Sequence, residues 1–148
     1  ASLPAGFPTP WVVVWAFRWL MARIMLGAGL IKIRGDTCWR DLTAMCYHYE
    51  TQPVPNPLSW FLHHTPLWVH KFETMANHII ELLFPFLLIM PWHGVRTFGA
   101  VVQILFQVTL ILSGNLSFLN WLTIVPALLC LDDLFLSRFF PKATTAMV

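Results

Sequence analysis

The chain has 148 residues, of which 57% are hydrophobic and 11% are charged, and its formal net charge is +2. Soluble domains carry about 25% charged residues, so a soluble fold of this length has too few polar side chains to cover its surface. The charge is small and no run of Lys or Arg occurs, which argues against a nucleic-acid partner. The composition predicts an all-α fold, a polytopic transmembrane helix bundle of about four spans in contact with membrane lipid.

The first predicted span covers residues 11–33. This length is sufficient to cross a hydrocarbon core of about 30 Å, which requires about 20 helical residues. Tryptophans stand at its start, as is typical of a membrane interface, and Lys32 and Arg34 stand at its end. We expect these two cations to reach toward lipid head groups.

A polar, aromatic segment follows at 34–66, with prolines at alternate positions between Thr51 and Pro57. Such spacing bars a helix there and favours extended backbone. The many aromatic residues predict a structured interfacial loop, folded back against the bundle, rather than a free linker. Its candidate structural or functional residues are Arg34, Asp36, Trp39, Arg40, Asp41, His48, Glu50, Pro53, Asn56, His63 and His64.

The second predicted span covers 67–90, and Pro85 should kink it. Residues 97–131 then contain no charged side chain, a stretch too long for one crossing. Ser113, Gly114 and Asn115 form the natural break, which gives third and fourth spans at 95–112 and 116–131. We interpret 1–148 as a single membrane-embedded domain and as an internal fragment of a larger protein.

Polar residues inside the spans form a second group of candidates. Glu73, Asn77 and Glu81 recur at i, i+4 and i+8, a spacing that places them on one helix face. Ionisable residues within a span are costly and are expected to face the bundle interior, paired with one another. The predicted intramembrane polar face comprises Arg23, His70, Glu73, Asn77, His78, Glu81, Gln103, Gln107, Asn115 and Asn120.

Two interpretations of this polar face remain open. It could line a polar cavity or site between spans, or it could be a structural network that fixes helix packing. Arg18 and Arg23 are candidate partners for Glu73 and Glu81. Gly99, one turn before Gln103, should allow another helix to approach closely.

The histidines form only one adjacent pair, His63 and His64, and lack the repeated clusters that a di-iron site requires. We therefore predict no metal and no cofactor.

A desolvated lysine can act as a base, which makes Lys32 a speculative catalytic residue, although a snorkelling anchor is the simpler interpretation. Cys38 and Cys46 could form a disulfide in an oxidising lumen, but free thiols are the simpler expectation.

Several sequence blocks then resemble the lipase maturation factor family. They are Gly29–Asp36 (GLIKIRGD), Cys38–Thr43 (CWRDLT), His48–Pro53 (HYETQP), Pro55–Pro57 (PNP), the His63–His64 pair, His78 with Glu81 and Leu82, Gln103–Gln107 (QILFQ), Ser113–Thr123 (SGNLSFLNWLT) and Asp132–Asp133. A fainter resemblance, around Ala28–Lys32, Asp36 and Trp39, extends to the membrane domain of vitamin K-dependent gamma-carboxylase.

The main resemblance implies a multi-pass protein of the endoplasmic reticulum membrane. Such proteins help secreted lipases, such as lipoprotein lipase, to fold and assemble, and the lipase clients are engaged by the full-length protein. The predicted function is thus a non-enzymatic maturation factor. The fainter resemblance implies an alternative, a membrane enzyme that uses Lys32 on a lipid or quinone-like substrate. A transport pathway along the polar face is a third hypothesis.

Overall fold

A computed structural model describes residues 9–53, 56–114, 118–131 and 133–139. Within these ranges the regular structure is entirely helical, as predicted. The helices are α1 (Trp11–Arg34), α2 (Thr37–Arg40), α3 (Met45–His48), α4 (Pro57–His63), α5 (Leu67–Leu82), α6 (Phe84–Ile89), α7 (His93–Ser113), α8 (Leu119–Leu128) and α9 (Asp133–Leu136).

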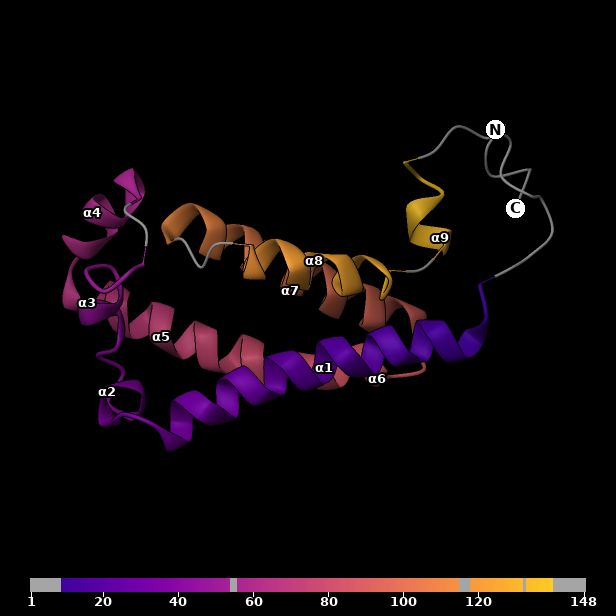
Figure 1. Cartoon of the computed structure of the whole chain (residues 1–148), viewed down its shortest axis with the longest axis horizontal. Coiled ribbons are helices and arrows are strands. Elements are labelled where there is room, and N and C mark those ends of the chain that lie inside the picture. The colour runs from indigo at the N-terminus through magenta and orange to yellow at the C-terminus, as the bar shows by residue number, and fades with distance from the viewer. Residues whose placement is uncertain (1–8, 54–55, 115–117, 132, 140–148) are drawn as a thin grey trace.

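The long helices run back and forth along the molecule, so neighbours in sequence are antiparallel (Figure 1). Helix α1 packs against α5, α6 and α8, while α7 packs against α6 and α8. The short helices α2, α3 and α4 gather at one end, beside the end of α1 and the start of α5 (Figure 1). This arrangement gives the bundle a loop end and an opposite end.

Three helical segments of the described chain are long and apolar enough to cross a membrane: Trp11–Arg34, Leu67–Ile89 and His93–Ser113. The predicted third span, 95–112, lies within α7. The predicted fourth span, 116–131, corresponds to the shorter helix α8, and residues 116 and 117 lie outside the described residues. Three long apolar helices and a shorter one agree with the predicted membrane bundle.

Pro85 interrupts the second span. The helix ends at Leu82 and resumes at Phe84, so the span consists of α5 and α6. Proline has no N–H group, so residue 85 makes no bond to the carbonyl of Glu81, and its ring crowds that turn. After the break, α6 packs against α7 and α1.

The distribution of side chains is inverted relative to a soluble protein. Large apolar residues such as Trp19, Phe72 and Leu105 are exposed, while Glu81 and Gln103 are buried. Apolar side chains on the outside suit a lipid environment, and polar side chains inside a membrane bundle pair with one another.

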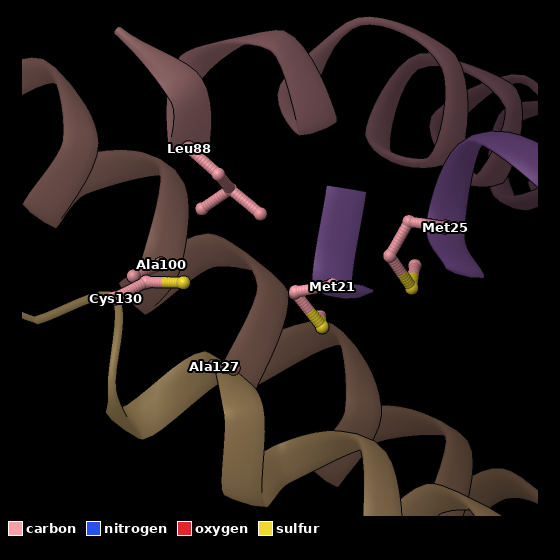
Figure 2. Close-up of a cluster of buried hydrophobic side chains, with 6 residues drawn as sticks. All are labelled: Met21, Met25, Leu88, Ala100, Ala127 and Cys130. Carbon is pink, nitrogen blue, oxygen red and sulfur yellow. The ribbon is translucent and has the colours of Figure 1, made fainter. Parts of the chain in front are cut away.

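The apolar core lies away from the loop end. It comprises six residues from α1, α6, α7, α8 and the turn after α8, whose side chains face one another in Figure 2: Met21, Met25, Leu88, Ala100, Ala127 and Cys130. Two glycines allow the helices to approach. A Cβ on Gly29 would lie 2.8 Å from Leu82 Cδ2, and one on Gly99 would lie 2.9 Å from Leu87 Cβ. Small side chains at these contacts permit tight packing without a hydrophobic driving force.

Candidate functional site

A buried ion pair joins α1 to α5 close to the loop end. Lys32 Nζ lies 2.6 Å from Glu81 Oε1 and donates a hydrogen bond of 3.1 Å to Asn77 Oδ1. Asn77 Nδ2 donates in turn to Glu81 Oε2 at 3.1 Å. The Glu81 side chain is 4% exposed and that of Lys32 23%. The i, i+4 spacing on α5 therefore presents both an amide and a carboxylate to one lysine from α1.

This placement corrects two expectations from the sequence. Lys32 does not extend along the surface toward head groups, because its ammonium group turns inward to Glu81. The partner of Glu81 is thus a lysine at the end of α1 rather than Arg18 or Arg23. Arg18 instead lies over the Trp11 ring, at 5.0 Å from its centroid, and Arg23 is exposed.

Helix α2 covers the ion pair. Lys32 Nζ lies 4.8 Å from the centroid of the Trp39 ring, within the range of a cation–π contact. His78 Nε2 lies 2.9 Å from the Trp39 carbonyl oxygen, which ties α2 to α5. The lysine is therefore enclosed by a carboxylate, an amide and an aromatic face.

A second polar cluster joins α3, α4 and α5. Tyr49 donates a hydrogen bond of 2.9 Å to Glu73 Oε2, and His70 Nδ1 lies 3.7 Å from the same oxygen. Burial raises the pKa of Tyr49, and the negative charge of Glu73 raises it further, so the phenol keeps the proton that it donates. His63 Nε2 lies 3.0 Å from Glu50 Oε1.

The proline-rich loop satisfies the end of α7. Asn56 Nδ2 donates to the Leu112 carbonyl at 3.0 Å and lies 3.4 Å from those of Ile111 and Gly114. Ser59 Oγ donates to the Ser113 carbonyl at 2.6 Å. The last carbonyls of a helix have no intrahelical partner, so these side chains replace the missing donors. This contact explains how the loop folds back against the bundle.

His48 completes the loop cluster from α3. Its Nε2 lies 2.6 Å from Gln52 Nε2, and Gln52 also donates to the His48 carbonyl. Burial lowers the pKa of His48, and the nearby positive charge of Lys32 lowers it further. A neutral imidazole accepts a hydrogen bond at one ring nitrogen, which suits the amide of Gln52.

The remaining members of the predicted polar face are spread through the bundle. Gln103 is fully buried and donates to the Ile80 carbonyl at 2.9 Å, while Gln107 Nε2 lies 3.5 Å from Met25 Sδ. Asn120 is buried in α8. Asn115 lies outside the described residues. These remaining members therefore join α5, α7 and α1 through separate contacts.

Several predicted loop residues remain apart from these clusters. Arg34, Arg40, Asp41 and Pro53 are exposed, and within the described chain the side chains of the first three have no hydrogen bond or ion pair. Asp36 accepts a hydrogen bond from the Cys38 amide at the start of α2, and His64 Nδ1 lies 2.7 Å from the Trp60 carbonyl. A structural or functional role for Asp41 therefore stays a prediction.

Sequence reasoning missed three residues at this end of the molecule. They are Tyr49, Gln52 and Ser59, none of which is among the candidate site residues that the sequence indicates. Their partners lie on other helices or at helix ends, so no local spacing signals them.

Cys38 and Cys46 are free thiols in the structure. No group of three or more His, Cys, Asp or Glu side chains converges as a metal site in the part of the chain that the structure describes.

A pocket of about 380 Å³ lies between α5 and α7, beside α3 and α4. We call it the α5–α7 pocket. Its walls are largely apolar and include Phe72, Ala76, Ile80, Leu105 and Phe106. Its polar side chains include four from the two clusters, His48, Tyr49, Glu73 and Asn77, and two from α7, Thr109 and Ser113.

Apolar helices of membrane-spanning length, an apolar exterior and buried polar clusters define a multi-pass helical membrane protein. The family model for the lipase maturation factor transmembrane domain matches residues 1–138. The chain therefore belongs to the lipase maturation factor family, in agreement with the predicted resemblance.

Individual relatives support this assignment. The chain is 63% identical over 142 residues to lipase maturation factor 1 from Bos taurus and also from Homo sapiens, covering 96% of this chain and 25% of each relative. It is 41% identical over 132 residues to lipase maturation factor 2 from Gallus gallus, covering 88% of this chain and 18% of the relative. The chain thus spans about a quarter of the length of its factor 1 relatives. No solved structure matches it.

Proposed function

We propose that this chain is part of the membrane portion of a maturation factor that helps secreted lipases, such as lipoprotein lipase, to fold and assemble in the endoplasmic reticulum membrane. The observation that carries the proposal is membership of the lipase maturation factor family over most of the chain. In this proposal the lipase clients are engaged by the full-length protein, and the chain has no catalytic role of its own.

The geometry supports a scaffold role. Three hydrogen bonds fix the loop between α1 and α5 to the bundle. The Trp39 carbonyl bonds to α5, Tyr49 donates to Glu73 of α5, and Asn56 donates to a carbonyl at the end of α7. A loop held in this way has few alternative conformations, so it can present a constant surface at the end of the bundle. We propose that this surface faces the compartment in which the clients fold.

The test is a rescue experiment. The full-length protein is expressed with lipoprotein lipase in cells that lack their own maturation factor, and active lipase is measured in the medium. Restored activity supports the proposal. A well-expressed protein resident in the endoplasmic reticulum that restores no activity would contradict the lipase assignment and direct attention to other secreted clients.

The alternative, a membrane enzyme that uses Lys32, has one observation in its favour. The Lys32 ammonium group is directed into the protein, where a substrate-bearing site would need it. Replacing Lys32 with Met distinguishes the two in the rescue assay. If function is lost while abundance and thermal stability are retained, the enzyme is favoured; a parallel loss of abundance supports the scaffold.

A further inference from the structure

The α5–α7 pocket is open toward the apolar exterior of the bundle. Phe72 on α5 and Leu105 on α7 line it and are 67% and 60% exposed, so both also belong to the outer surface. Both helices lie in segments long and apolar enough to cross a membrane. A molecule that enters between these two side chains therefore comes from the lipid phase, and its apolar part contacts Ala76, Ile80 and Phe106.

The polar end of the pocket presents one carboxylate oxygen without a hydrogen-bond donor among the described residues. Asn77 is already engaged on both sides, because it accepts from Lys32 and donates to Glu81. Tyr49 donates its proton to Glu73 Oε2, which leaves Glu73 Oε1 without a hydrogen-bond partner among the described residues. Glu73 is the one lining residue with a formal negative charge. A buried or half-buried acceptor of this kind favours a ligand that donates a hydrogen bond.

We propose that this pocket binds a single-chain lipid with a neutral, hydroxyl-bearing head, of which a monoacylglycerol is the simplest example. The chain lies between α5 and α7, and a head hydroxyl donates to Glu73 Oε1. A fatty acid has the same chain, but its carboxylate meets the negative charge of Glu73. The nearest cation, Lys32, is paired with Glu81 and does not line the pocket, so it is not available to compensate the carboxylate of a fatty acid. This inference is independent of the proposed lipase function.

The probe is a monoacylglycerol with a photoreactive diazirine in its acyl chain, added to membranes that contain the full-length protein. After irradiation, labelled peptides are mapped by mass spectrometry. We expect labelling on α5 and α7 around Ala76 and Leu105. Competition by 1-monooleoylglycerol should reduce this labelling roughly tenfold under conditions where oleate has little effect, a difference of about 1.4 kcal/mol in binding.

Two variants obstruct the pocket or its entrance, and a third variant is their control. Ala76→Phe places a ring in the pocket and should reduce labelling about tenfold. Met75→Phe places the same ring at the neighbouring, 50% exposed position outside the lining and should leave labelling unchanged. Leu105→Trp narrows the entrance at an exposed site, so it tests the pocket even if Ala76→Phe disturbs folding. Glu73→Gln removes the negative charge and should allow oleate to compete.

Each of three results would overturn the inference. Equal competition by oleate and 1-monooleoylglycerol would refute selection by the Glu73 carboxylate. Unchanged labelling in both Ala76→Phe and Leu105→Trp, at normal abundance, would place the lipid elsewhere. Absence of labelling on α5 and α7 in the full-length protein would show that another segment of that protein fills this space.

Discussion

The two ends of the bundle are held together by different forces. At the loop end, helices meet through an ion pair and hydrogen bonds, chiefly Lys32 with Glu81, Tyr49 with Glu73 and Asn56 with the end of α7. Toward the opposite end, Met21, Leu88 and small or soft side chains form an apolar core, with the buried Arg18 and Arg96 beside it. Directional contacts require specific partners, whereas apolar packing tolerates volume-conserving exchanges. The loop end should therefore be the more sensitive to single substitutions.

The largest expected effect is at the ion pair. Replacing Glu81 with Leu leaves the Lys32 ammonium group without its carboxylate, and removing one partner of a buried pair typically costs about 3–5 kcal/mol. Because Lys32 is 23% exposed, we expect about 3 kcal/mol, the lower end of that range. The measurement is thermal unfolding of the purified full-length protein in detergent, with Glu50→Leu at an exposed ion pair as the control.

The double variant Lys32→Met with Glu81→Leu sharpens this prediction. It removes both charges together, so most of the lost stability should return. Losses that simply add in the double variant would show that the two side chains act independently, and the distinction between the two ends would lose its main support.

The second effect concerns helix approach near the loop end. Gly29→Ala places a Cβ 2.8 Å from Leu82 Cδ2 and 3.0 Å from Glu81 Cβ, so α1 and α5 must separate or Leu82 must shift. Overpacking of this kind costs about 1–3 kcal/mol. Gly27→Ala is the matched control, since a Cβ there meets nothing within 4 Å. Equal thermal stability of the two variants would contradict the close packing of these helices.

The third effect is at the cap of α7. Asn56→Ala removes the donor to the Leu112 carbonyl and the acceptor for the Leu58 amide, and we expect a loss of about 1–2 kcal/mol. Asn56→Asp keeps the acceptor but turns a carboxylate oxygen toward the carbonyls, so it should be at least as damaging. Limited proteolysis of the loop will report both variants. Greater resistance of the Asp variant than of the Ala variant would contradict the capping role.

The smallest effect is the pH dependence of the loop. The pKa of His48 is lowered from its ordinary value of 6.5, so the folded protein binds this proton less readily than the unfolded chain. The stability that the folded protein gains from neutral His48 is therefore fully present above the ordinary pKa. It is lost as the pH falls toward the lowered pKa of the folded protein. Between about pH 7.5 and about pH 5.5, thermal stability should fall less in His48→Gln than in the unmodified protein. An identical fall in both proteins would assign the pH dependence to other groups.

The sequence by itself determined the class of this protein. Scarcity of charge and long apolar stretches leave little alternative to membrane helices, because backbone polar groups in lipid must be satisfied within the segment. The spacing of Glu73, Asn77 and Glu81 follows from helical geometry alone, as does the break caused by Pro85. The family resemblance rests on motifs read directly from the sequence, and the family match over residues 1–138 confirms it.

Only the tertiary structure decided which polar groups meet. Lys32 and Glu81 are 49 residues apart, and Asn56 contacts a carbonyl 56 residues away. Such contacts depend on the rotation and register of one helix against another, and these are set by packing at places such as Gly29 and Gly99. A local pattern shows that a carboxylate faces inward, but its partner is fixed by which helix lies opposite. For that reason the sequence indicated Arg18 and Arg23, whereas the structure places Lys32 beside Glu81.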